Sequence, residues 1–218
     1  WHGEFSGYGT ADGEMQWGTA IAIDSTDRLF LADEKMQRIT IFDSENNYVS
    51  HWGTAGSGPN EFDGPSGLAF DAENNLLVVD HKNHRIQRYT SDGEYIDSFG
   101  SEGSAKGQFN YPWGITTSSD GTIYVADWRN DRIQRFEADG VFIDAHGESG
   151  DGDGQFNRPS SVAVDDDGFI YVADWQNQRV QVFDKDWNFQ TIVLGEAGLS
   201  PWAADYINAN KDERIARD

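Results

Sequence analysis

The sequence predicts an all-β protein of the β-propeller class, built from four copies of one unit. Three observations predict it: a repeat of constant length, short apolar segments divided by Gly and Asp, and tight-turn residues between those segments. A repeat of about 40–50 residues that forms four antiparallel strands is the blade of a propeller. Helical repeats of similar length are excluded, because the segments are short and rich in β-branched and aromatic residues.

The repeat is marked by an aspartate that ends an apolar segment and by an arginine five residues later. Successive aspartates lie 47 residues apart, without an insertion. The pairs are Asp33 and Arg38, Asp80 and Arg85, Asp127 and Arg132, and Asp174 and Arg179. Because a feature present in every copy is scaffolding rather than a site, we expect a structural role. Each aspartate would accept backbone N–H bonds in the turn that follows it, and the arginine would pair with it.

Each copy is expected to form four strands, A to D. The predicted blades span residues 20–52, 67–99, 114–146 and 161–194. Strand A begins at Ile21, Leu68, Ile115 and Val162. A turn such as Asp120-Gly121 follows it and supplies the positive φ that a tight hairpin needs. Strand B is apolar at consecutive positions, so both of its faces are expected to be buried.

Within residues 154–183 the last copy reads Gly-Gln-Phe-Asn-Arg-Pro, then Val-Ala-Val-Asp, Ile-Tyr-Val-Ala-Asp and Arg-Val-Gln-Val-Phe. This pattern resembles the NHL repeat, and the second and third copies match it nearly as well. In the first copy Gly18 replaces a proline, and Met36 stands where the other copies have asparagine. The resemblance covers about residues 1–195. It implies a β-propeller, usually six-bladed, with a central channel. NHL members include protein scaffolds, RNA-binding modules, receptor domains and metal-dependent lyases, so the resemblance implies no single function.

Positions that differ between copies are the better guide to a site. The loops that follow strand B and precede strand A share one face of a propeller, and these loops carry large side chains. The candidates for a binding face are Trp17, His81, Tyr111, Trp113, Trp128, Arg158 and Trp175. Exposed aromatic side chains on one face mark contact with a protein or a sugar. The alternative is that these rings pack between blades as core.

Composition excludes several classes of function. The 38 acidic and 16 basic residues give a net charge of −22, which disfavours binding to nucleic acid and to anionic membranes. Cysteine is absent, so disulfides and zinc–thiolate sites are excluded. One histidine in a suitable loop does not build a metal centre, so we predict no catalytic residues and no cofactor. Calcium at the acidic turns 151–153 and 165–168 is the alternative, but neither turn has the twelve-residue calcium-loop pattern.

The two ends of the chain depart from the repeat. Trp1, His2, Gly3, Glu4 and Phe5 correspond to a fifth strand D, which is surplus to the four copies. Residues 196–218 are expected to form a tail with a helix over about 201–216. Two explanations fit the surplus strand. The copies belong to a six-bladed ring, or four blades form a ring or arc whose spare strand pairs with a neighbouring copy.

We therefore predict a non-enzymatic propeller that serves as a protein-interaction scaffold or as a self-assembling, filament-type subunit. Its partners would be a protein ligand or other copies of itself. The first residue is Trp1 rather than Met, so either a leader was removed or the sequence is a fragment of a longer chain; of the two we favour secretion and expect an extracellular protein. The alternatives are a metal-dependent lyase or lactonase-like enzyme and a carbohydrate-binding propeller.

Overall fold

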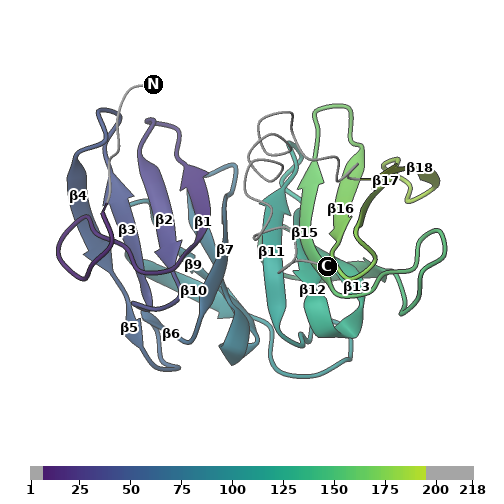
Figure 1. Cartoon of the computed structure of the whole chain (residues 1–218), viewed down its shortest axis with the longest axis horizontal. Helices are drawn as coiled ribbons and strands as arrows, with labels where there is room; N and C mark the ends of the chain where they lie inside the picture. Colours follow the sequence, from purple (N-terminus) through teal and green to yellow (C-terminus); the bar gives the residue numbers. More distant parts are fainter. Residues whose placement is uncertain (1–6, 195–218) are drawn as a thin grey trace, which may run out of the picture.

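The computed structural model describes residues 7–194, which form four antiparallel sheets of four strands each (Figure 1). Within every sheet the strands lie in chain order. The first sheet holds β1 (Gly18–Ile23), β2 (Leu29–Asp33), β3 (Arg38–Phe42) and β4 (Tyr48–Trp52). The second holds β7 (Pro65–Phe70), β8 (Leu76–Asp80), β9 (Arg85–Tyr89) and β10 (Tyr95–Phe99). The third holds β11 (Pro112–Thr117), β12 (Ile123–Asp127), β13 (Arg132–Phe136) and β14 (Phe142–His146). The fourth holds β15 (Pro159–Val164), β16 (Ile170–Asp174), β17 (Arg179–Phe183) and β18 (Phe189–Leu194).

The remaining elements are short and lie in the loops. A parallel pair, β5 (Thr54–Ala55) and β6 (Glu61–Phe62), precedes the second sheet. Two 3₁₀ turns, η1 (His81–Asn83) and η2 (Trp128–Asn130), follow the second strands of the second and third sheets. None of the helices in this part of the chain has the length and apolar content needed to cross a membrane.

The prediction of an all-β fold made of four-stranded antiparallel sheets is confirmed. The first strand of each sheet begins three residues earlier than predicted, at Gly18, Pro65, Pro112 and Pro159. The cause is an irregularity in strand register that lets pairing continue past the predicted start, as in the pairing of Pro65 with Asp80. A proline is tolerated there because the first position of a strand need not donate to its neighbour.

The core lies between neighbouring sheets rather than inside any one of them. Three buried clusters each join residues of two consecutive sheets. Each cluster includes one phenylalanine from the loop that enters the later sheet: Phe62, Phe109 and Phe156. A sheet that buries both faces in this way needs a neighbour on each side. The predicted two-sided burial holds for β8 and β12, all of whose residues are buried, but alternate residues of β16 are only half-buried.

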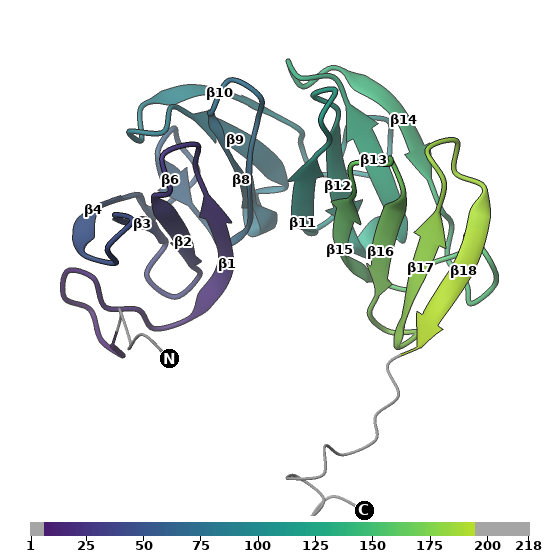
Figure 2. The same ribbon diagram turned by 90° about the horizontal axis from the view of Figure 1, so that it is seen from above.

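The four sheets stand side by side along an arc that stays open (Figure 2). At one end of the arc, Ile21 in β1 is 59% exposed, whereas its equivalents Leu68, Ile115 and Val162 are 7%, 8% and 3% exposed. The equivalents are buried because the preceding sheet covers them. The first sheet therefore exposes a face whose equivalent is buried in the other three sheets. The predicted strand over residues 1–5 and the predicted helix over 201–216 lie outside the described residues.

The repeated aspartate forms a hydrogen-bonded network in three of the sheets, which we call the aspartate clasp. Asp80 accepts the backbone N–H of Asp63 at 2.8 Å and the side chains of Asn83, Arg85 and Gln87 at 2.9, 2.9 and 3.2 Å. Asp127 and Asp174 accept the same four kinds of donor. The backbone donor comes from the loop that enters the sheet, not from the following turn as predicted. The clasp therefore holds that loop against the strands.

The first sheet departs from this pattern. Within residues 7–194, Asp33 accepts only backbone N–H groups, from Gln16, Trp17, Lys35 and Met36. The predicted pairing of Arg38 with Asp33 is wrong, because Arg38 forms no ion pair among residues 7–194 and donates instead to the carbonyl oxygens of Ala11 and Glu14. Met36 and Thr40 take the places of the clasp asparagine and glutamine, so two of its donors are missing.

Candidate functional site

The turn after each second strand is hydrogen-bonded to the loop that enters the same sheet. The backbone N–H of His81 donates to Gly64, and that of Arg129 donates to Asn110, at 3.2 and 3.0 Å. Glu34 and Gln176 form the corresponding bonds in the outer sheets. These turns and loops therefore share one edge of the molecule, the lower edge in Figure 1 where β5 and β6 lie. We call this edge the loop face.

Three tryptophans from two sheets form a row on the loop face. The ring centres of Trp113 and Trp128 lie 6.3 Å apart, and those of Trp128 and Trp175 also lie 6.3 Å apart. With Ser160 they line a pocket of about 310 Å³. Trp175 is 57% exposed, and the other two rings are half-buried. The tryptophan row is therefore a surface feature, not the inter-blade core that was the alternative.

Two arginines lie over this row. The guanidinium carbon of Arg158 is 4.9 Å from the centre of the Trp128 ring, and that of Arg129 is 5.4 Å from it. Arg129 also lies 4.2 Å from the centre of the Tyr111 ring. Within the described part of the chain neither guanidinium has a carboxylate partner, whereas Arg85 and Arg132 are paired with aspartates. The row therefore carries two positive charges that no described carboxylate neutralises.

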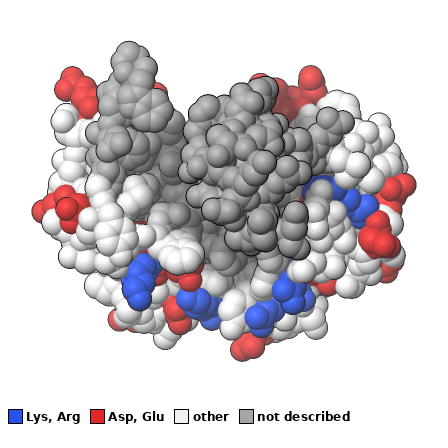
Figure 3. All heavy atoms as spheres, viewed as in Figure 1, with Lys and Arg blue, Asp and Glu red and all other residues white. Residues whose placement is uncertain are grey.

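Arg129 was missed in the sequence, although a signal was available. The second residue after the repeated aspartate is Lys35, Lys82 and Arg129 in the first three copies. These residues lie on the loop face with Arg158. Figure 3 shows Lys and Arg side chains mainly along the lower edge, whereas Asp and Glu are spread around the outline. The loop face therefore gathers basic side chains, with acidic ones among them, in a strongly acidic protein.

His81 lies behind the tryptophan row rather than on its surface, and it is only 5% exposed. Its ring centre is 4.9 Å from that of Trp113 and 5.8 Å from that of Tyr111, both nearly edge-on. Burial lowers the pKa of His81, so the ring is neutral at neutral pH. A side chain at Gly64 would meet the imidazole, since a Cβ there would lie 2.3 Å from it. His81 thus packs behind the aromatic rings, so that little of it is exposed on the predicted binding face.

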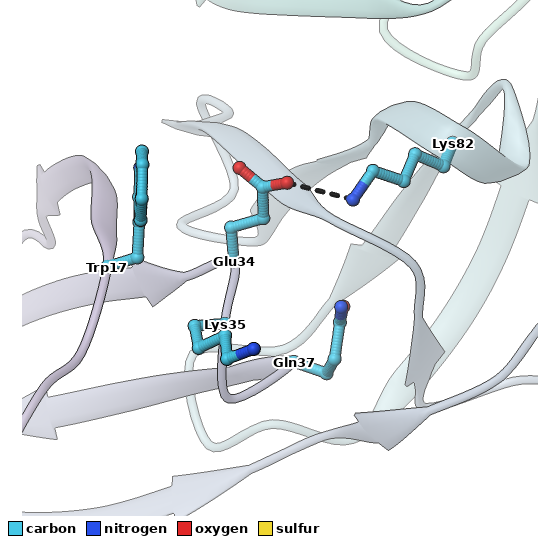
Figure 4. A pocket seen from close by; sticks show the side chains of 5 residues that line it. All are labelled: Trp17, Glu34, Lys35, Gln37 and Lys82. Carbon is cyan, nitrogen blue, oxygen red and sulfur yellow. Dashed lines mark hydrogen bonds and ion pairs between the residues drawn. The ribbon is translucent and has the colours of Figure 1, made fainter. Parts of the chain in front are cut away.

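Trp17 lies apart from the tryptophan row and has no ring contact with it in residues 7–194. It lines a second pocket, of about 380 Å³, together with Glu34, Lys35, Gln37 and Lys82 (Figure 4). Lys82 Nζ donates to Glu34 Oε1 at 2.8 Å across this pocket. That contact lowers the pKa of Glu34 against the opposing effect of burial, so the pair stays charged. The predicted binding face is therefore divided into two parts.

Residues 7–194 contain no group of three His, Asp or Glu side chains placed to hold one metal ion. The imidazole of His146 belongs to no such group and stacks on the Trp187 ring, with ring centres 4.2 Å apart. The pocket of the tryptophan row is lined by three tryptophans and a serine, none of which titrates near neutral pH. The described lining of this pocket therefore offers aromatic stacking.

Comparisons with known proteins agree with the repeat. A family model described as the NHL repeat matches residues 109–136 and 156–183. A second model, described as a 6-bladed beta-propeller, matches residues 19–100. No curated protein sequence matches the chain.

Solved structures share the fold at low sequence identity. A catalytically inactive virginiamycin B lyase from Staphylococcus aureus with quinupristin matches with a TM-score of 0.64 at 15% identity, over 84% of this chain and 58% of that one. A streptogramin B lyase matches with a TM-score of 0.65 at 13% identity, over 84% and 56%. Hydrazine synthase of Kuenenia stuttgartiensis matches with a TM-score of 0.62 at 16% identity, over 85% and 52%. The chain thus spans little more than half the length of these proteins. The chain therefore contains two matches to the NHL repeat and one to a 6-bladed beta-propeller model, and its four-stranded sheets have the architecture of propeller blades.

Proposed function

We propose that the protein is a non-enzymatic binding scaffold and that its ligand is a protein segment seated on the tryptophan row. The observation that carries the proposal is the pocket of about 310 Å³ between Trp113, Trp128 and Trp175. Exposed tryptophan and arginine side chains are the residues that contribute most to binding at protein interfaces. Here both types occur together on one edge of a rigid sheet scaffold.

The rigidity of the scaffold supports this proposal. The N–H of each residue that enters a blade is bound by the preceding blade: Gly64 by Gln37 at 2.7 Å, Tyr111 by His84 at 3.2 Å and Arg158 by Asp131 at 2.7 Å. These bonds fix the loop face from blade to blade. A preorganised surface binds more tightly because little conformational entropy is lost on binding.

A random-peptide display library tests the proposal. Clones selected on the intact chain should lose binding to Trp128→Ala and Trp175→Ala. They should retain binding to Phe169→Ala, which removes an aromatic ring from the turn before β16, outside the loop face. Selection of no clones, or of clones that ignore both tryptophan variants, would refute the proposal. A glycan array probed in parallel detects the carbohydrate-binding alternative.

The lyase fold of the similar structures favours a second candidate, an enzyme of related chemistry. Incubation of the protein with quinupristin, followed by mass spectrometry, separates the two. A scaffold leaves the compound intact. Its consumption, abolished by heat denaturation of the protein, would favour the enzyme.

For the complete ring we propose six blades, the number that the matched family model describes. The uncovered faces at both ends of the arc support a ring with more blades than the described four. In the chain as given, the same faces support association with further copies. The extracellular location also remains a prediction.

A further inference from the structure

We propose that the segment bound by the tryptophan row presents one large apolar side chain flanked by carboxylates. This inference rests on the proposed function and names the chemistry of its partner. The apolar side chain would fill the pocket between Trp113, Trp128 and Trp175, and the carboxylates would meet Arg129 and Arg158.

The lining of the pocket selects the apolar group. Its only hydroxyl belongs to Ser160, which donates to the carbonyl oxygen of Ala173 at 3.5 Å. A sugar ring placed here would find few partners for its hydroxyl groups and would lose hydrogen bonds to water. An aliphatic or aromatic side chain loses none. Its burial against three rings is favourable in proportion to the apolar surface removed from water.

The two arginines select the flanking groups. Each guanidinium stacks on the face of a ring, with Arg158 at 4.9 Å from the Trp128 centre, and stacking leaves its edge N–H donors free. Asp131 Oδ1 accepts a hydrogen bond from the backbone N–H of Arg158, and its carboxylate forms no described ion pair with the Arg158 guanidinium. A planar guanidinium forms paired hydrogen bonds with a carboxylate. The row is therefore prepared for an anionic group beside an apolar one.

The net charge of −22 repels an acidic partner, so binding depends on the distance over which each charge acts. At physiological salt, charges separated by more than about 8 Å are largely screened. The arginines act at contact distance, whereas the excess carboxylates are spread around the outline of the molecule (Figure 3). Binding therefore requires contact with the two arginines to outweigh the screened repulsion and the carboxylate of the neighbouring Asp131.

Four fluorescein-labelled peptides of equal length test the inference by anisotropy, with the full chain at physiological salt. The first carries leucine between pairs of aspartates, the second leucine between pairs of lysines, the third alanine between pairs of aspartates, and the fourth leucine between pairs of serines. We expect the first to bind at least fivefold more tightly than each of the others. Equal or tighter binding of the lysine or serine peptide would overturn the acidic requirement, and equal binding of the alanine peptide would overturn the apolar one.

Matched variants locate the contact. Arg129→Gln and Arg158→Gln should each weaken the first peptide about fivefold and leave the serine peptide unchanged. Lys185→Gln removes the same charge from a turn between β17 and β18, outside the loop face, and should change neither. Equal losses in all three variants would mean a general charge effect and would contradict the inference.

The outcomes also distinguish failure of this inference from failure of the proposed scaffold function. If the serine peptide binds best and Trp128→Ala abolishes its binding, the scaffold function stands and the acidic partner is wrong. If library selection also yields no clone that depends on the row, both fail. Preference for oligogalacturonate over every peptide, lost in Arg158→Gln, would assign the row to an acidic saccharide instead and overturn the inference.

Discussion

At the residue scale, the site depends on one glycine as much as on its aromatic rings. Gly64 has φ of +78°, and its lack of a side chain makes room for the buried ring of His81. The other copies have Trp17, Tyr111 and Arg158 at this position. Only the second blade therefore lacks a side chain at this position, and the His81 imidazole occupies that space behind Trp113.

Gly64→Ala should destabilise the protein more than Gly154→Ala. Both glycines have positive φ, +78° and +75°, so both substitutions incur backbone strain of about 1 kcal/mol. Only at Gly64 would the new Cβ also meet His81, whereas at Gly154 it meets nothing within 4 Å. Urea unfolding of the two variants measures the difference. Equal losses would show that the imidazole moves aside freely.

The Arg135–Asp144 pair gives a pH dependence. A hydrogen bond from Arg135 holds the pKa of Asp144 below its ordinary value. A carboxyl group with a lowered pKa in the folded state stabilises the protein fully above its unfolded pKa of about 3.9. That contribution is lost as the pH falls through the folded pKa. His146 Nε2, 3.3 Å from the same carboxylate, is a second contact.

Asp144→Asn should therefore cost about 0.5–1 kcal/mol at pH 7, a modest value because both partners are partly exposed. The difference from the unmodified protein should shrink from about pH 4 downward, as the pH falls toward the lowered pKa and Asp144 itself becomes protonated. Thermal unfolding across this pH range measures it. A constant difference at every pH would show that packing, not charge, is responsible.

At the scale of the element, the aspartate clasp joins each blade to the loop that enters it. In the third blade, Asp127 accepts the N–H of Asn110 at 2.7 Å and the Arg132 guanidinium at 2.8 Å. The carboxylate is fully buried. Its removal would leave the largely buried Arg132 guanidinium, 14% exposed, without its counter-charge, which is costly.

We expect Asp127→Ala to lower the free energy of unfolding by about 3–5 kcal/mol. Asp120→Ala, at an exposed turn, is the control and should cost about 1 kcal/mol. Chemical denaturation provides both values. A loss at Asp127 no larger than that at Asp120 would mean that the clasp only orders the loop.

The aspartate clasp also shows what the sequence could and could not predict about the strands and their contacts. The constant repeat and its short apolar segments were enough to predict four-stranded antiparallel sheets. Pattern alone could not show that Arg38 leaves Asp33, because this depends on the donors lost at Met36 and Thr40. Likewise the sequence placed Trp113, Trp128 and Trp175 on one face, but the burial of His81 follows from the absent side chain at Gly64. These outcomes depend on contacts between residues far apart in the chain.

At the scale of the whole molecule, the open arc leaves its two end faces uncovered. Ile21 and Ile23 are 59% and 62% exposed at one end, and Val193 and Leu194 are 52% and 66% exposed near the other. Exposed apolar surface of this kind promotes association.

The chain as given should therefore associate in a concentration-dependent way, and Ile21→Asp should reduce that association. Val141→Asp is the control, because Val141 is 58% exposed but lies at the turn before β14, not on an end face. Sedimentation velocity at several concentrations measures the effect. If Val141→Asp disrupts association as strongly as Ile21→Asp, the end face is not the contact.

The central claim is that the tryptophan row is where this propeller meets its partner. Nuclear magnetic resonance of the indole N–H groups tests it most directly, because the chain has eight tryptophans and each gives one signal. On addition of the aspartate–leucine peptide, we predict shifts in the signals of Trp113, Trp128 and Trp175 and none in those of Trp52 and Trp187. Unchanged signals from the row, or shifts confined to the other tryptophans, would contradict the claim.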